Sequence, residues 1–232
     1  MKKIIFFDTE TTGNTEKDVL CQIAYKTNDE TFSAMYNPGI KIPPEASAVH
    51  HITNKMIALK KTFAESGDKE KIKSLFEDSN SVAVAHNAPF DIMMFKKEGI
   101  EIPNFICTLR VARELDSEGV IERYNLQYLR YLLEIEIEAQ AHDALGDVMV
   151  LEQLFTRLQK KIMDTDGLDE NGAIEKMIEI SSHPSIIKIL NFGKYKGMKV
   201  EEVVKIDQGW LKWLLGEKEK SDQLDEDWIY TL

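Results

Sequence analysis

The chain has 232 residues and a net charge of −11, with 43% hydrophobic and 30% charged residues, which is the composition of a soluble globular protein. Its length suffices for one ordinary domain and a small second one, and no apolar run reaches the about 20 residues that cross a bilayer, so we expect no membrane partner. The strong negative charge disfavours a protein that grips nucleic acid through a broad basic surface.

The chain begins with a short apolar run. Lys2–Phe7 predicts a buried strand, because Asp8 ends the run before it reaches the about 7–15 apolar residues of a secretion signal. The two cysteines, Cys21 and Cys107, lie in separate apolar segments without a paired motif. We therefore expect buried, reduced thiols in a cytoplasmic protein.

The following segments predict strands interleaved with helices. Val19–Lys26 and Thr31–Tyr36 predict a hairpin, and Ser81–Ala85 and Asn104–Cys107 predict two further strands. Short helical turns are predicted within 41–59, and helices at 69–77, 89–99, 108–115 and 125–133. This order indicates an α/β fold whose mixed sheet is flanked by helices, with antiparallel strands on one side and parallel strands on the other.

The longest periodic segment runs from about Asp143 to Ile162 and predicts a helix with one apolar face. Residues 163–182 are expected to be a linker with a short helix, because residues 163–172 are acidic, contain glycine and have no apolar period. A second unit with its own apolar residues begins at His183. We therefore expect a main domain over 1–162 and a small C-terminal domain over 183–232.

Four acids and one histidine stand near the ends of these elements. Asp8 and Glu10 lie in FFDTETTG, Asp91 ends AHNAPFD, and His142 and Asp147 lie in AHDALGD. Carboxylates that gather in one place raise one another's pKa unless cations are bound, and oxygen ligands without cysteine favour magnesium or manganese over zinc. A histidine in the loop before a helix suits a general base. The set predicts a metal-dependent phosphoryl-transfer site.

The motifs DTETTG, IPPEASAVHHIT, AHNAPFD and AHDALGD, in this order, resemble the DnaQ-like 3′–5′ exonucleases of the DEDDh type, which have a ribonuclease-H-like fold. The resemblance covers about residues 1–160. It implies that Asp8, Glu10, Asp91 and Asp147 hold two Mg²⁺ (or Mn²⁺) ions, that His142 is the general base, and that nucleoside 5′-monophosphates are released from DNA 3′ ends in repair or end trimming. The expected substrate-binding residues are Thr9, Thr12, His50, His51, Ile52 and Asn87, the last of which caps its helix or orients a partner.

The C-terminal segment HPSIIKILNFGKYKGMKVEEVVKIDQGWLKWLL resembles the C-terminal part of exodeoxyribonuclease X. Between His183 and Val200 it has four lysines, two interleaved aromatic residues and no acid. One interpretation is a DNA contact through Lys194, Tyr195, Lys196 and Lys199. The other is a solvated lysine face over a small aromatic core. Even a bound phosphate backbone would be held only moderately, which predicts weak processivity.

Several alternatives stay open from sequence. Within the family, these are RNA trimming of the ribonuclease T kind and proofreading of the polymerase III epsilon kind, so RNA is not excluded as a partner. The polar run 14–17 contains no apolar wedge for duplex ends, which favours single-stranded 3′ ends. Glu10 disfavours a haloacid-dehalogenase phosphatase, which needs a second aspartate. The presence of all five catalytic residue types opposes a catalytically silent nucleic-acid-binding module.

Overall fold

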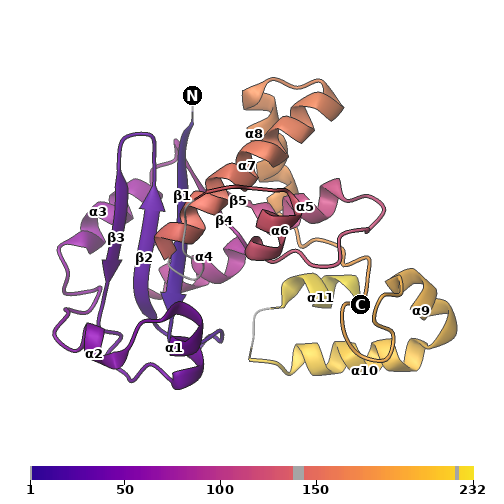
Figure 1. The fold of residues 1–232 in the computed structure, drawn as a ribbon, viewed down its shortest axis with the longest axis horizontal. Helices are drawn as coiled ribbons and strands as arrows, with labels where there is room; N and C mark the ends of the chain where they lie inside the picture. Colours follow the sequence, from indigo (N-terminus) through magenta and orange to yellow (C-terminus); the bar gives the residue numbers. More distant parts are fainter. Residues whose placement is uncertain (1, 138–143, 223–224) are drawn as a thin grey trace.

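A computed structural model describes residues 2–137, 144–222 and 225–232. Its centre is one five-stranded sheet in the order β3-β2-β1-β4-β5 (Figure 1). The strands are β1 (Lys3–Thr11), β2 (Leu20–Lys26), β3 (Thr31–Met35), β4 (Ser81–Ala85) and β5 (Phe105–Cys107). The first three strands pair antiparallel, and β4 and β5 continue the sheet in parallel. The predicted mixed sheet flanked by helices is confirmed.

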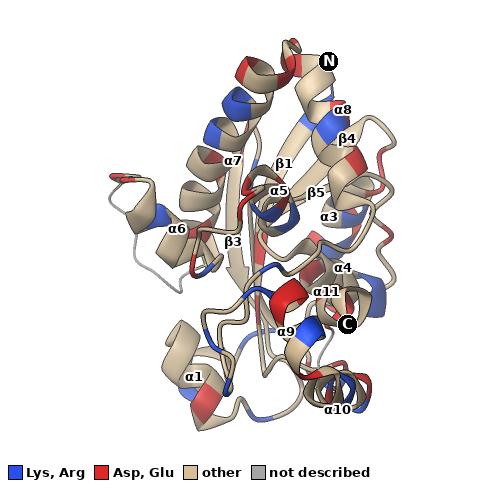
Figure 2. Ribbon diagram, turned by 90° about the vertical axis from the view of Figure 1, so that its right-hand side faces the viewer, with Lys and Arg blue, Asp and Glu red and all other residues tan. Residues whose placement is uncertain are grey.

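Helices cover both faces of this sheet and form the C-terminal unit. They are α1 (Pro44–His50), α2 (Asn54–Ile57), α3 (Asp68–Phe76), α4 (Ala88–Lys97), α5 (Thr108–Leu115), α6 (Leu126–Leu132), α7 (Ala144–Asp166), α8 (Glu170–Ser181), α9 (Val200–Ile206), α10 (Gln208–Glu219) and α11 (Glu226–Thr231). Figure 2 shows acidic and basic residues interspersed along α7 and α10, so the negative charge is not gathered on one helix. Among the described helices, none has both the length and the apolar character needed to cross a bilayer.

The alternation of side chains along β1 decides which way its acids point. Phe7 packs edge-on against Phe76 of α3 and Phe95 of α4, on one face of the sheet. Phe6 packs edge-on against Phe155 of α7, on the other face. Since residues two apart in a strand share a face, Asp8 and Glu10 lie on the side of Phe6, where α7 crosses the sheet.

β1 is longer than the predicted strand. It continues to Thr11 because β2 pairs with it along Asp8, Thr9 and Glu10, with a register shift between Glu10 and Thr11. β4 stops earlier, since its last pair with β1 joins Val84 to Phe6. The two acids therefore lie within β1, on a stretch that β2 supports on one edge and that β4 leaves open on the other.

The expected linker at 163–182 is packed helix in the structure. α7 continues through Asp166, and α8 follows after a turn in which Gly167 has a φ of +68°. The apolar side of α8 is buried, with Ala173, Ile174 and Met177 in the same core as β4, α5 and α7. The acidic composition of 163–172 suggested a linker because its charged residues face solvent, while the apolar ones that follow complete the core.

The C-terminal unit has a separate, small core around Trp228, which includes Leu190, Val203 and Leu214. Its helices α9, α10 and α11 lie together beside the sheet domain (Figure 1). Both cysteines of the chain, Cys21 and Cys107, are buried free thiols in the sheet domain, as expected. The last turn of α8 ends at Ser181, before the first residues of this small core.

Candidate active site

Three carboxylates from two elements meet at the open stretch of β1. Asp8 and Glu10 of β1 and Asp147 of α7 each offer an oxygen, and these oxygens lie within 4.8 Å of one another. Asp147 stands four residues before Leu151 and eight before Phe155, so it continues the stripe of α7 that packs on the sheet. The contact between Phe6 and Phe155 thus sets the height at which Asp147 meets the strand acids.

This cluster has the donors of a hard-cation site. It consists of carboxylate oxygens alone, and Asp147 is buried while Asp8 and Glu10 are half-buried. Three carboxylates so close together repel one another in a partly dry site, and a divalent cation relieves this repulsion. Magnesium and manganese prefer such ligands. The Gln127 side chain of α6 donates a hydrogen bond of 2.5 Å to Oδ1 of Asp147, which holds this carboxylate in place.

Asp91 of α4 lies beside the cluster. Its Oδ1 accepts hydrogen bonds from the backbone N–H of Thr9 at 3.1 Å and from the Thr9 hydroxyl at 2.6 Å. Thr9 stands between Asp8 and Glu10, and its N–H is available because β4 ends before it. Burial raises the pKa of Asp91 to about 7, while the two bonds from Thr9 oppose the rise. A carboxyl group with a pKa near 7 is only partly ionised at neutral pH, and a cation bound nearby favours its ionised form.

The predicted general base, His142, lies outside the described residues, and so does Asp143. The structure describes the chain again from Ala144, the first residue of α7. Asp147 follows in the first turn of this helix, where the helix dipole favours a carboxylate. His142 stays a prediction from sequence.

A cavity of about 490 Å³ opens next to the acids. It is lined by Thr9–Asn14 of β1 and its loop, by Pro43, Glu45, Ala46, Val49 and His50 around α1, and by Phe90 of α4. Glu10 is common to the acid cluster and the cavity, so a molecule in the cavity reaches the cluster. The volume is in the range of small-ligand sites, and Val49 and Phe90 give it an apolar side that suits a nucleobase.

The expected substrate residues Thr9 and Thr12 line this cavity, but both hydroxyls are engaged. The Thr9 hydroxyl binds Asp91, and the Thr12 hydroxyl donates to Asp18 at 2.9 Å. Asp18 fills the space behind Gly13, where a Cβ would come within 2.6 Å of its carboxylate. The loop after β1 is therefore a tight structure that a side chain at residue 13 would disturb.

His50, His51 and Ile52, the three expected substrate-binding residues at the end of α1, have different surroundings. His50 lines the cavity and is buried; its Nδ1 accepts from the N–H of Ile52 at 3.0 Å, so Nε2 carries the proton that it donates to the Thr11 carbonyl at 3.2 Å. Burial lowers the pKa of His50, which keeps it neutral. His51 is exposed in the left-handed region at φ 62°, and the Ile52 side chain is buried against Cys21. Within this segment, His50 is the residue that faces the cavity.

Asn87 and His86 precede α4. Asn87 adopts a left-handed conformation at φ 66° and its side chain makes no capping bond. Of its two expected roles, capping the helix and orienting a partner, the structure does not show the first. His86 has a structural role: Nε2 donates to the Tyr124 carbonyl at 2.5 Å and Nδ1 lies 2.9 Å from the Thr108 hydroxyl. Burial lowers the pKa of His86 to about 4.

The predicted DNA-contact residues of the tail form a folded loop. Tyr195 packs edge-on against Trp210 and donates to Asp207 at 2.7 Å, and Lys194 pairs with the same carboxylate at 2.7 Å. Lys196 is exposed, and Lys199 precedes α9 as its N-cap. Tyr195 and Lys194 thus serve the fold of the unit, in agreement with the aromatic-core interpretation for these two residues.

Comparisons with known proteins agree with this geometry. The sequence matches the exonuclease family (RNase_T) over residues 5–155 and the exodeoxyribonuclease X-like C-terminal family over residues 190–219. The chain belongs to the exonuclease family. The predicted nuclease of the DnaQ-like type, with a tail like that of exodeoxyribonuclease X, is confirmed.

Two curated relatives illustrate the match. The chain is 31% identical to exodeoxyribonuclease 10 of Escherichia coli K12 over 189 residues, which cover 78% of this chain and 75% of the relative. It is 33% identical over 200 residues to a DNA polymerase III subunit epsilon-like protein of Rhodobacter capsulatus. The match covers 81% of this chain but spans only 27% of that longer relative.

Solved exonucleases share the fold. A structure of exonuclease X in complex with 5′-overhanging duplex DNA superposes with a TM-score of 0.58 at 27% identity, covering 77% of this chain and 99% of that one. Escherichia coli exonuclease I in a complex with single-stranded DNA superposes with a TM-score of 0.57 at 21% identity, covering 71% of this chain and 41% of that one. The second likeness shows the fold alone.

Two features near the site could not be predicted from the sequence. Gln127 stands 20 residues before Asp147 in the chain, and nothing in its surroundings marks it as a partner of that acid. Arg110 and Arg113 of α5 bind Asp227 of α11, more than a hundred residues away. Their spacing of three places both arginines on one side of α5, but the partner cannot be found from local sequence.

Proposed function

We propose that this protein is a 3′–5′ exodeoxyribonuclease that removes nucleoside 5′-monophosphates one at a time from DNA 3′ ends, with single-stranded ends preferred. The observation that carries the proposal is the junction between the acid cluster and the neighbouring cavity at Glu10. A terminal nucleotide in the cavity has its phosphodiester beside Asp8, Glu10 and Asp147. Family membership supplies the reaction class.

The acids hold the reaction centre in this proposal. Asp8, Glu10 and Asp147 would ligate divalent cations, two Mg²⁺ or Mn²⁺, with Asp91 as the fourth acid. When bound, such ions supply positive charge to the phosphoryl oxygens and to the leaving 3′-oxygen. Thr9 fixes Asp91, and Gln127 fixes Asp147, so both carboxylates are oriented by side chains outside the cluster. His142 would accept the proton of the water that attacks phosphorus in line.

In this proposal the cavity binds the terminal nucleotide of the DNA strand. Val49 and Phe90 would pack against the terminal base, and base–aromatic stacking is tolerant of sequence. The neutral His50 keeps the α1 segment against β1 through the Thr11 carbonyl. We further propose that the catalytic domain includes α8 and that the C-terminal domain begins near His183, because α8 completes the core of the sheet domain.

The test is hydrolysis of 5′-labelled oligonucleotides by the full chain with and without Mg²⁺. We expect mononucleotide release from single-stranded DNA, slower release from a blunt duplex, and little from matched RNA. Asp8→Asn should lower the rate by about 10³-fold or more, because the loss of ion binding removes several kcal/mol of transition-state stabilisation.

The matched control is Asp29→Asn, an exposed acid in the turn between β2 and β3, which should keep full activity. Equal rates on DNA and RNA would favour RNA trimming over the proposed substrate. Tight oligonucleotide binding without any metal-dependent product would support the silent binding module instead.

A further inference from the structure

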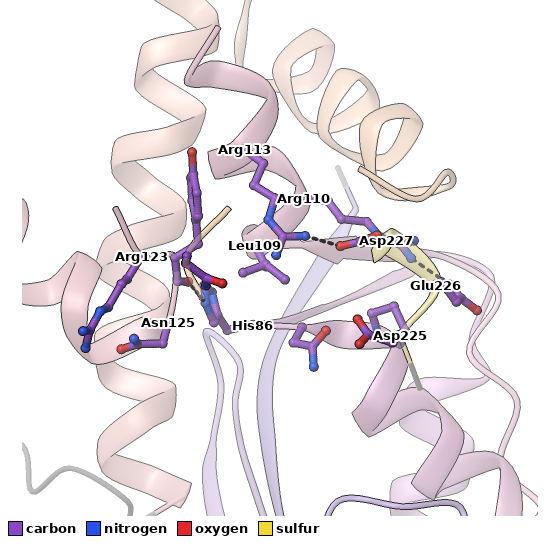
Figure 3. Close-up of a pocket in the computed structure, with 13 residues that line it drawn as sticks. His86, Leu109, Arg110, Arg113, Arg123, Asn125, Asp225, Glu226 and Asp227 are labelled. Atoms are coloured by element: carbon purple, nitrogen blue, oxygen red, sulfur yellow. Dashed lines mark hydrogen bonds and ion pairs between the residues drawn. The ribbon is translucent and has the colours of Figure 1, made fainter. Parts of the chain in front are cut away.

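The C-terminal unit and the sheet domain enclose a second cavity, of about 400 Å³. One wall comes from the sheet domain, with Arg123 and Asn125 before α6, and the opposite wall comes from the tail, with residues 225–227 and Asn191. Figure 3 shows these walls with His86 between them. We call this space the inter-unit cleft.

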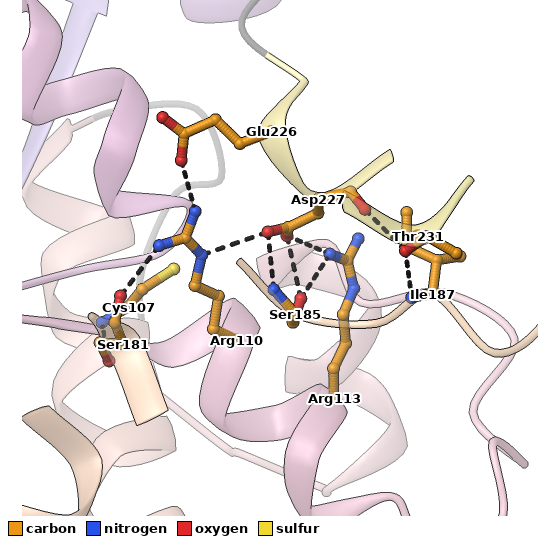
Figure 4. Close-up of polar contacts among 9 residues, drawn as sticks. All are labelled: Cys107, Arg110, Arg113, Ser181, Ser185, Ile187, Glu226, Asp227 and Thr231. Atoms are coloured by element: carbon orange, nitrogen blue, oxygen red, sulfur yellow. Dashed lines mark hydrogen bonds and ion pairs between the residues drawn. The ribbon is translucent and has the colours of Figure 1, made fainter. Parts of the chain in front are cut away.

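The tail is fixed against the sheet domain by a buried polar network. Arg110, whose side chain is 4% exposed, donates to Asp227 at 3.2 Å, to Glu226 at 2.7 Å and to the Ser181 carbonyl at 2.9 Å. Asp227 also binds Arg113 and accepts from the N–H of Ser185 at 2.9 Å (Figure 4). The cleft therefore has two walls whose separation is set by short, buried contacts.

The charges of the cleft are unequally satisfied. Arg110 and Arg113 are paired with Glu226 and Asp227, and Asp225 is paired with Lys218. Arg123 is exposed and has no ion-pair or hydrogen-bond partner among the described residues. Among the described residues, the side-chain amides of Asn87 and Asn191 likewise make no hydrogen bond. The side chain of Asn125 caps α6 through its oxygen, so its NH₂ group is unused. The free groups thus include a cation and several amide donors, which suits an anion.

The cleft adjoins the active site through two elements. Asn87 and Pro89 line the cleft while the next residue, Phe90, lines the nucleotide cavity, so the start of α4 separates the two spaces. On the other side, Asn125 begins the helix in which Gln127 binds Asp147. When the terminal nucleotide of a DNA strand lies at the acids, the inter-unit cleft is the polar space next to it.

We propose that the inter-unit cleft binds the phosphate backbone of the single-stranded substrate upstream of its terminal nucleotide, with Arg123 and Asn191 contacting phosphate from opposite walls. This inference rests on the proposed function and assigns the tail a place in it. In this proposal the tail contributes through its cleft wall, and a contact through Lys196 and Lys199 stays a separate prediction from sequence. The cleft volume suits about one nucleotide unit, so its effect depends on substrate length.

The experiment compares kcat/KM for a dinucleotide and an octanucleotide of single-stranded DNA, with the full chain. Arg123→Ala and Asn191→Asp should each lower kcat/KM for the octanucleotide about three- to tenfold, the worth of one charge-assisted contact, and leave the dinucleotide unchanged. Arg123→Ala should also flatten the salt dependence for the octanucleotide by about one phosphate contact.

The matched control is Lys205→Ala, which removes an exposed charge from α9 in the tail and should change neither substrate. Wild-type rates on the octanucleotide in either cleft variant would overturn the proposal, and so would equal losses on both substrates. A protein without metal-dependent hydrolysis of any DNA would refute the proposed function instead, so the two failures are distinguishable.

Discussion

In the sheet domain, apolar side chains pack on both faces of the sheet and place the acids, whereas the C-terminal unit has only a small core around Trp228 and joins the rest through ion pairs. The contact of Phe6 with Phe155 fixes β1 against α7 without any charge. The contact of Arg110 with Asp227 fixes the tail through two desolvated charges. Apolar packing tolerates small losses, but a buried ion pair that loses one partner leaves a charge unpaired.

The largest effect is expected from the apolar part of this comparison. Phe7→Ala removes a fully buried ring that contacts Phe76 and Phe95, and it should lower the free energy of unfolding of the sheet domain by about 3–5 kcal/mol. Urea unfolding followed by circular dichroism measures it. Tyr131→Ala, at a residue that is 75% exposed, is the control and should stay within about 0.5 kcal/mol.

The polar attachment should fail locally. Asp227→Ala leaves the buried Arg110 without its more buried carboxylate partner and Arg113 without its ion pair, and we expect the tail to become less stable by about 3 kcal/mol while the sheet domain keeps its stability. Hydrogen exchange should then rise in α9–α11 and stay slow in β1 and α7. Glu226→Ala is the control within the same network, because the Glu226 side chain is 48% exposed and its pair is worth at most about 1 kcal/mol. Uniform loss of protection across the chain would contradict this division.

Acid should act on the sheet domain through His86. Burial lowers the pKa of His86 from 6.5 to about 4, so in this range the unfolded chain binds more protons than the folded one. Stability is therefore lost as the pH falls from 6.5 to about 4, by up to about 3 kcal/mol from this group. Urea unfolding at pH 7 and pH 4.5 should show this loss in the wild type relative to His86→Gln. An imidazole that titrates near pH 6.5 in nuclear magnetic resonance would contradict it.

The smallest effect concerns the link between helix α6 and the acids. Gln127→Ala removes the hydrogen bond to Asp147, and we expect the apparent affinity for Mn²⁺ to fall about 10–100-fold with little change in stability. Titration calorimetry of metal binding distinguishes this positioning role from a structural one. Gln153→Ala removes an exposed glutamine from α7 and should leave metal affinity as it is. An unchanged Mn²⁺ affinity in Gln127→Ala would show that Asp147 keeps its position without Gln127.

Local sequence was enough for the strands and for most of the acids. Apolar runs such as Ser81–Ala85 end where a polar residue follows, and this pattern depends only on neighbouring residues. The extension of β1 beyond Phe7 was missed because it depends on pairing with β2. The burial of α8 was missed because Ile174 and Met177 find their partners on other elements.

The candidate site was predictable in its acids and less so in their support. The side chains of Asp8, Glu10 and Asp147 come together as expected, because strand alternation and helix spacing aim them at one point. The partner of Asp91 could not be read from the sequence, since Thr9 and Asp91 are 82 residues apart. The ion pair between Arg110 and Asp227 could not be predicted either, because these residues are 117 residues apart. Hydrogen bonds between distant residues carry no periodic signal.

The unequal lengths of β1 and β4 have a consequence for how this site could arise or be lost. If two more residues of the chain after Val84 and Ala85 continued the ladder, a carbonyl would take up the N–H of Thr9 that now serves Asp91. All four acids would remain in the sequence, yet the fourth, Asp91, would keep only one of its two hydrogen bonds from Thr9, the one from the hydroxyl. An insertion at this strand end would therefore weaken the positioning of Asp91 without altering any of the four acids, and inspection of motifs alone would not reveal the change.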